Sequence, residues 1–167
     1  MAKPHELTLW TALATEAAGR ALADAILATA VESLLVFLRG PLGAGKTTWV
    51  RGALAGLGHA GRVPSPTYAL IEPYAVSGFN VYHIDLYRLE SQREVLELGL
   101  DELLSSPRNL AFIEWPERAA DVLPAPDLDV LLELHPDGRV LTANAPSATG
   151  QRVLKAWMAT NHLRKST

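Results

Sequence analysis

A glycine-rich stretch that ends in lysine and threonine carries the clearest chemistry in this sequence. Residues 40–47 read Gly-Pro-Leu-Gly-Ala-Gly-Lys-Thr and match the P-loop pattern G-x-x-x-x-G-K-[ST]. Glycines allow the backbone conformations that turn successive N–H groups inward around phosphate oxygens. The lysine reaches the β- and γ-phosphates, and the threonine hydroxyl is placed to ligate Mg²⁺. The predicted phosphate-binding residues are Gly40, Gly43, Ala44, Gly45, Lys46, Thr47 and Thr48.

The segments on either side of this motif are of the kinds that a P-loop requires. Residues 34–38 are a short apolar run, typical of a buried parallel strand. Residues 48–57 carry apolar side chains at helical spacing, and Gly58 follows as a helix stop. A helix that begins at the glycine loop adds its N-terminal dipole to the anion site. Strand, loop and helix stand in the required order, so the sequence predicts binding of a nucleoside triphosphate.

Two acidic residues end predicted strands and are candidates for metal binding and catalysis. Glu114 ends a second buried-type apolar run. Because strand carboxyl ends open onto the nucleotide crevice, Glu114 is predicted to act on Mg²⁺ together with Thr47. Asp85 ends another predicted strand and could hold a metal-bound water or orient the attacking water. An ion pair between Asp85 and Arg88 is the structural alternative.

Three further residues each have a chemical and a structural interpretation. Thr67 follows Ser-Pro at the mouth of a loop, where a switch protein places a γ-phosphate sensor, although turn chemistry alone explains the spacing. Trp115 stands beside Glu114, so it is either a core aromatic or a lid or partner contact near the site. His83 shares a strand face with Asp85, and a satisfied strand histidine is the simpler interpretation.

The remaining strand patterns predict two hairpins. Extended runs at 68–76 and 80–85 flank the turn Ser77-Gly78. The alternating run 128–134 turns at Pro136-Asp137-Gly138 and pairs back over 140–143. Because hairpins are antiparallel and the buried-type runs are typical of parallel strands, the predicted sheet is mixed.

Helices are predicted on either side of that sheet. Residues 7–10 are typical of a short edge strand, and residues 11–28 of an amphipathic helix. Residues 91–94 read as a capping box, and Ser147 caps a last helix. The predicted fold is therefore a single α/β P-loop domain with a mixed, parallel and antiparallel, central sheet flanked by helices.

Length and composition limit the class of protein. With 167 residues the chain is predicted to form one domain over 1–167, with a flexible basic tail at about 162–167. No apolar run approaches transmembrane length and no signal-peptide pattern is present, so no membrane association is expected. The sequence has no cysteine, which excludes disulfides and favours the cytoplasm. A net charge of −3 argues against an extended nucleic-acid surface.

Taken together, five motifs resemble the TsaE (YjeE) family, the small bacterial ATPase of tRNA threonylcarbamoyladenosine biosynthesis. They are residues 40–48, Ser65 to Tyr68, His83 to Leu89, Glu97 to Gly99 and Ile113 to Pro116. The resemblance implies ATP and Mg²⁺ as cofactors, with Thr47 and Glu114 as metal ligands. It also implies that Asp85 is essential for activity, that Thr67 lies in a switch-like loop and that Trp115 lies near the nucleotide.

The same resemblance implies protein partners. TsaB and TsaD transfer threonylcarbamoyl to N6 of adenosine 37 in tRNAs that read codons starting with A, and ATP hydrolysis by TsaE resets their complex. Contact with tRNA would then be indirect, through the complex. Pro41 departs from the family pattern, which commonly has aspartate there, but it lies early in the loop, where side chains point away from phosphate.

Two other classes of function are compatible with a P-loop protein of this size. A small-molecule kinase would need a lid with paired arginines and a pocket for the acceptor, and the arginines of this sequence are scattered. A nucleotide-switched binding module would hydrolyse ATP at a negligible rate. Turnover measured alone, with small acceptors and with TsaB and TsaD distinguishes these functions.

Overall fold

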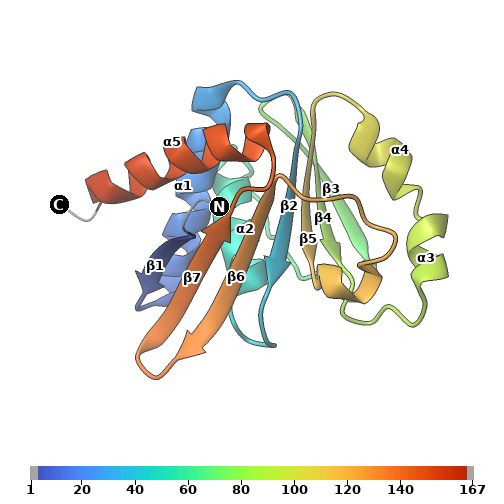
Figure 1. Ribbon diagram of the computed structural model, residues 1–167, viewed down its shortest axis with the longest axis horizontal. Helices are drawn as coiled ribbons and strands as arrows, with labels where there is room; N and C mark the ends of the chain where they lie inside the picture. The colour runs from blue at the N-terminus through green and yellow to red at the C-terminus, as the bar shows by residue number, and fades with distance from the viewer. Residues whose placement is uncertain (1–3, 165–167) are drawn as a thin grey trace.

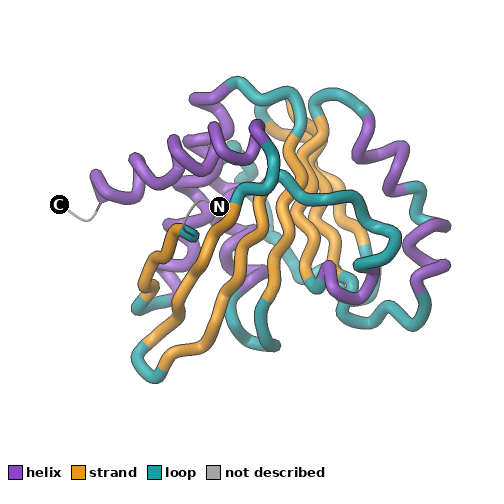
Figure 2. Tube along the Cα trace, viewed as in Figure 1, coloured by secondary structure: helices purple, strands orange, loops and turns teal. Residues whose placement is uncertain are grey.

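The computed structural model describes residues 4–164, with side chains described for residues 4–160. Figures 1 and 2 show helices on both sides of a central sheet. In chain order the elements are β1 (His5–Leu9), α1 (Ala12–Thr29), β2 (Leu34–Arg39), α2 (Lys46–Gly56), β3 (Ile71–Val76), β4 (Phe79–Asp85), α3 (Gln92–Glu97), α4 (Leu100–Ser105), β5 (Asn109–Glu114), the 3₁₀ helix η1 (Pro116–Ala119), β6 (Leu128–His135), β7 (Gly138–Asn144) and α5 (Ala148–Arg164).

The sheet is mixed, which confirms the prediction from the strand patterns. Over residues 4–164 it has seven strands in the order β1-β7-β6-β2-β5-β4-β3. The strand β2 pairs in parallel with β5 and β6, and β4 pairs in parallel with β5. The pairs β3–β4, β6–β7 and β1–β7 are antiparallel. The two hairpins therefore add antiparallel edges to a parallel centre.

Each face of the sheet has its own hydrophobic core. On one face α1, α2 and α5 pack together, and the fully buried Trp49 and Trp157 meet edge to face with ring centroids 5.7 Å apart. The Trp157 ring nitrogen donates to the Ala18 carbonyl at 2.9 Å, which ties α5 to α1. On the other face, α3, α4 and η1 cover apolar residues of β2, β4 and β5. The domain is thus a three-layer α/β/α structure.

The helices α1 and α2 touch through their backbones because glycines lie in the contact. A Cβ on Gly19 of α1 would collide with the Trp49 carbonyl, and a Cβ on Gly52 of α2 would collide with the Glu16 carbonyl. Interiors packed at this density do not absorb an added methyl group freely. This contact fixes the helix that follows the glycine loop against α1.

Gly52→Ala is therefore expected to destabilise the protein by about 1–3 kcal/mol, the usual effect of overpacking, because the new methyl group meets backbone. The better helix propensity of alanine offsets at most about 1 kcal/mol of the gross effect. Urea unfolding measures the difference. Arg51→Ala, at an exposed neighbour on the same helix, is the control and should change stability by less than about 0.5 kcal/mol. Equal stability of Gly52→Ala and wild type would contradict the close contact.

Strand register brings the two predicted acids together. Asp85 on β4 pairs with Glu114 on β5, and Leu38 on β2 pairs with the same Glu114. The carboxyl ends of β2, β4 and β5 thus meet at one edge of the sheet, where the glycine loop leaves β2. Neighbouring parallel strands always present their carboxyl ends together, which is why this edge carries the ligand site in open α/β sheets.

Residues 68–70, predicted to be extended, form a turn instead. Leu70 has a φ of 62°, and its N–H donates to the Pro66 carbonyl at 2.8 Å. The Leu70 carbonyl in turn accepts from the Asp85 N–H at 3.0 Å. The turn closes the loop over the end of β4, so β3 begins at Ile71.

The outer strand β3 contains a proline in its middle. Pro73 lies opposite Tyr82 of β4. Proline has no N–H to donate, and sheets accept it on an edge strand. The strand β3 is the edge of the sheet in the described residues, so Pro73 is compatible with the hairpin.

The predicted helix starts are confirmed. Ser91 and Glu94 form a reciprocal capping box at α3, and the Gly150 N–H donates to the Ser147 side chain at 2.9 Å at the start of α5. Residues 162–164 of the predicted tail continue α5, and residues 165–167 lie outside the described residues. Among the described residues, no helix combines the length and apolar character that crossing a membrane requires.

Candidate functional site

A cavity of about 420 Å³ opens where the parallel strands end. This volume falls within the usual range of small-ligand sites. The lining residues are Leu42, Gly43, Gly45, Lys46, Thr47, Thr48, Ser65, Thr67, Asp85, Tyr87, Arg88, Glu114, Trp115 and Arg139. They come from the glycine loop, the loop before β3, the ends of β4 and β5, and the start of β7. The structure therefore brings together most of the residues that the sequence singles out.

The glycine loop has the backbone geometry that its motif predicts. Gly40, Gly43 and Gly45 have φ angles of 132°, 78° and 101°, a region that favours glycine. Gly40 lies outside the cavity lining and packs against the Leu132 backbone, where a Cβ would collide. Ala44 also lies outside the lining, with its side chain buried in the core. These two residues shape the loop, and their contact with phosphate stays a prediction.

Lys46 lies folded over the loop. Its Nζ donates to the Gly40 and Pro41 carbonyls at 2.7 and 2.9 Å, and it lies 4.1 Å from the centre of the Trp115 ring. Burial lowers the pKa of Lys46, while the nearby carboxylates, Glu114 first, oppose this shift. The ammonium group is thus held by backbone oxygens and an aromatic face. Phosphate oxygens would replace both with a stronger, charge-assisted interaction.

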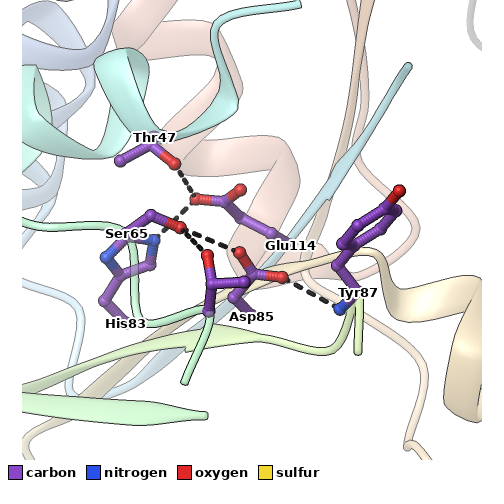
Figure 3. Close-up of polar contacts among 7 residues, drawn as sticks. Thr47, Ser65, His83, Asp85, Tyr87 and Glu114 are labelled. Atoms are coloured by element: carbon purple, nitrogen blue, oxygen red, sulfur yellow. Dashed lines mark hydrogen bonds and ion pairs between the residues drawn. The ribbon is translucent and has the colours of Figure 1, made fainter. Parts of the chain in front are cut away.

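Glu114 is the buried acid at the centre of the site. Its Oε1 accepts from the Thr47 hydroxyl at 2.8 Å and from the His83 Nε2 at 2.7 Å (Figure 3). His83 is fully buried and only 3% of Glu114 is exposed, so the histidine orients the carboxylate from inside the protein. The structural interpretation of His83 as a satisfied strand residue holds only in part, because Nε2 has Glu114 as its partner while the buried Nδ1 has none among the described residues.

Asp85 lies beside this pair and is held by two donors. The Ser65 hydroxyl donates to its Oδ2 at 3.0 Å, and the Tyr87 N–H donates to its Oδ1 at 2.9 Å (Figure 3). Ser65 also contacts the Thr67 hydroxyl at 2.7 Å. No local pattern predicts Ser65 and Tyr87 as partners of Asp85, although both stand in the motifs that carry the family resemblance.

The alternative ion pair of Asp85 with Arg88 does not form in the described structure. The guanidinium of Arg88 lies over the Tyr68 ring, 4.4 Å from its centre, and Nη2 donates to the Tyr68 hydroxyl at 3.4 Å. Tyr68 is 84% exposed. Arg88 thus lines the cavity, while its guanidinium contacts an exposed aromatic side chain of the neighbouring loop.

Trp115 packs as a core aromatic and also lines the cavity, while a lid or partner contact stays a prediction. Its ring lies against the second core and lines the cavity, 4.8 Å from the ring of Tyr87. Its backbone is left-handed, with a φ of 59°, and the following Pro116 disfavours the right-handed helical region at this position. Strain of this kind is often found at functional sites. Binding of the nucleotide by Trp115 stays a prediction.

Arg139 lines the cavity but stands in no motif of the sequence. It is the second residue of β7, directly after Gly138. Its Nε lies 2.9 Å from where a Cβ on Gly45 would stand. Gly45 and Arg139 are more than ninety positions apart in the chain and come together through the sheet order, which a single sequence does not reveal.

The oxygen atoms at the site fit a hard divalent cation. Thr47, Glu114 and Asp85 present a hydroxyl and two carboxylates within one cavity. In the part of the chain that the structure describes, no group of three or more His, Cys, Asp or Glu side chains could hold a metal alone. Mg²⁺ fits such a site, since it is usually bound through one or two protein oxygens together with substrate phosphates.

The family model and the curated relatives that match this chain carry the same name. The family described as "Threonylcarbamoyl adenosine biosynthesis protein TsaE" matches residues 11–141. The protein named tRNA threonylcarbamoyladenosine biosynthesis protein TsaE from Haemophilus influenzae is 37% identical over 140 residues, which cover 83% of this chain and 88% of that protein. The protein of the same name from Rickettsia bellii is 40% identical over 132 residues, covering 78% of this chain and 90% of that one.

A solved structure agrees with these sequence matches. The crystal structure of YdiB from Bacillus subtilis superposes with a TM-score of 0.80 at 26% identity, and the match covers 96% of this chain and 98% of that one. The family match includes the glycine loop, Asp85 and Glu114, and all the residues that line the cavity lie within it. The chain belongs to the TsaE family of threonylcarbamoyl adenosine biosynthesis proteins.

Proposed function

We propose that this protein is a Mg²⁺-dependent ATPase that serves the N6-threonylcarbamoyladenosine modification of tRNA by acting on a TsaB–TsaD complex. The observation that carries the ATPase proposal is the contact of Thr47 with Glu114 at 2.8 Å. It joins the P-loop threonine to a strand-end acid, which is the arrangement that holds the metal in P-loop proteins. The pathway rests on family membership and on the names of the relatives.

Binding uses charges and backbone groups that are already in place. Bound Mg²⁺ would neutralise charge on the β- and γ-phosphates. Thr47 and Glu114 would hold it, directly or through water. Lys46 would exchange the carbonyls of Gly40 and Pro41 for phosphate oxygens, because its Nζ lies at the mouth of the loop. The N–H groups at the start of α2 add a favourable field for the anion.

Asp85 is placed to act on water. Its carboxylate is fixed by Ser65 and by the Tyr87 N–H, so its two oxygens have defined directions. An acid held in this way can orient a water molecule for attack on the γ-phosphate and accept its proton. Thr67 reaches Ser65 through its hydroxyl, so movement of that loop would change the position of Asp85.

The partners follow from the family. The net charge of −3 makes this chain a poor platform for tRNA by itself, so TsaB and TsaD would carry the RNA contact. Cytoplasmic tRNA modification is the setting that this function requires. Hydrolysis by the isolated protein is expected to be slow, because the guanidinium of Arg88 lies over the Tyr68 ring and forms no ion pair with Asp85 in the described structure.

The test is the rate of ATP hydrolysis alone, with small alcohols or nucleosides, and with TsaB and TsaD. We expect a slow basal rate that small acceptors leave unchanged and that the two proteins together raise by about tenfold or more, since completion of a P-loop site by a partner has effects of up to about 10⁵-fold elsewhere. The Lys46→Ala variant in the same mixture is the control for contaminating ATPase.

Each competing function has its own outcome in that assay. Turnover that depends on a small acceptor would identify a kinase. A rate that stays negligible with and without TsaB and TsaD, together with tight ATP binding, would identify a nucleotide-switched binding module.

A further inference from the structure

A buried donor without an acceptor marks the side of the cavity away from the acids. The Nε of Arg139 is buried, and the described residues offer it no hydrogen-bond partner. Arg139 lines the same cavity as the glycine loop. Leaving a charged donor unpaired is unfavourable, and native proteins rarely do so without a reason. A bound anion would supply the missing acceptor.

The position of Arg139 is fixed by the sheet. It is paired on one side with Leu9 of β1 and on the other with Leu134 of β6. A Cβ on Gly138 would come within 2.9 Å of the Trp10 Cα, so the start of β7 lies close against the segment after β1. A side chain on a strand that is paired on both sides is well suited to a binding contact, since its backbone does not have to be ordered on binding.

The absence of a side chain at Gly45 leaves room for Arg139 beside the glycine loop. A Cβ there would stand 2.9 Å from the Arg139 Nε and 3.3 Å from its Cδ. The same point lies 3.3 Å from the Thr15 Cγ2 of α1. The bare Cα of Gly45 therefore lets the arginine stem lie against the loop, so that its guanidinium reaches the phosphate-binding cavity.

The sheet order shows which part of the nucleotide this arginine faces. The strands β4 and β5, which carry Asp85 and Glu114, lie on one side of β2, and β6 and β7 lie on the other (Figure 1). The metal and the γ-phosphate belong with the two acids. Arg139 approaches the loop from the opposite side, where the phosphates nearer to the nucleoside would lie.

We propose that Arg139 is a nucleotide-binding residue that contacts the α- and β-phosphates shared by ATP and ADP. This inference rests on the proposed nucleotide function of the cavity. A guanidinium can donate two parallel hydrogen bonds to phosphate oxygens, and lysine cannot reproduce that fork. The contact does not depend on the γ-phosphate, so it holds ATP before hydrolysis and ADP after it.

The test compares Arg139→Met and Arg139→Lys with wild type by titration calorimetry, using Mg²⁺–ATP, Mg²⁺–ADP and Mg²⁺–tripolyphosphate. Arg139→Met should weaken all three by roughly ten- to a hundredfold, the range for a lost charge-assisted contact. Arg139→Lys should recover part of the affinity. Arg152→Met, at an exposed arginine on α5, is the control and should leave all three unchanged. Thermal unfolding of each variant reports folding independently.

Three outcomes would overturn the proposal. Unchanged affinities in folded Arg139→Met would show that the arginine makes no contact. Loss of ATP affinity with ADP affinity unchanged would place the contact at the γ-phosphate. Loss for ATP and ADP with tripolyphosphate unchanged would place it at the nucleoside. Failure of wild type to bind any of the three would refute the proposed function itself, and that result is read from the wild-type titration alone.

Discussion

Asp85→Asn should lower partner-stimulated ATP turnover by about 10²–10⁴-fold, the usual contribution of a positioned general base, while the affinity for Mg²⁺–ATP stays within a few-fold. Asparagine keeps an oxygen that can accept from the Tyr87 N–H, and its amide group can donate to the Ser65 hydroxyl, which donates to Oδ2 of the native carboxylate. The variant removes the charge that orients water and accepts its proton. An effect on turnover without one on binding marks an interaction made mainly in the transition state.

Glu114→Gln is the comparison that separates the two acids. Glu114 contacts Thr47, the other proposed metal ligand, so its loss should weaken Mg²⁺-dependent binding of ATP as well as turnover. Affinities measured with Mg²⁺ and with EDTA, together with stimulated rates, distinguish the two variants. If Asp85→Asn abolishes Mg²⁺–ATP binding and Glu114→Gln spares it, the two roles are reversed. Thermal unfolding must accompany the assay, because Glu114 also pairs with the buried His83.

Lys46→Met should weaken ATP binding by roughly ten- to a hundredfold, since a hydrogen bond to a charged group contributes about 1.5–3 kcal/mol. The ammonium group already lies at the mouth of the loop, 2.7 Å from the Gly40 carbonyl. Methionine has a similar length and removes the charge, and with it the contact of Nζ with the Trp115 ring. Titration calorimetry with Mg²⁺–ATP measures the loss.

The control for this variant is Lys155→Met, which removes an exposed lysine from α5. It changes net charge by the same amount at a distance from the cavity, so ATP affinity should remain at the wild-type value. Equal affinities of Lys46→Met and wild type would refute the role assigned to this lysine. Parallel weakening by both variants would point to a general effect of charge.

The fold was predictable where local patterns decide structure. The apolar runs before Gly40 and Glu114 are buried parallel strands, and the turns at Ser77 and Gly138 join antiparallel pairs. The juxtaposition of Asp85 with Glu114 also follows, because neighbouring parallel strands end together. These features depend on residues close in sequence or on a general rule of sheet geometry.

Other features depend on contacts that no local pattern contains. Leu13 has the apolar character and helical spacing of a buried residue but is 79% exposed, since the buried positions of α1 begin at Thr15. The turn at Leu70 requires a left-handed backbone conformation that no sequence pattern predicts. Arg139 reaches the cavity because β6 lies next to β2 and brings β7 with it.

Pro73 has a consequence for how other proteins can approach. An exposed sheet edge can pair with a strand of another chain, which leads to β-augmentation or to aggregation. In the middle of β3, Pro73 removes one donor from the outer edge of the sheet, so an added strand would lack a hydrogen bond there. We therefore expect Pro73 to disfavour self-association through this edge. A partner is favoured to bind through side chains and loops, and the loop that carries the exposed Tyr68 offers these beside the cavity.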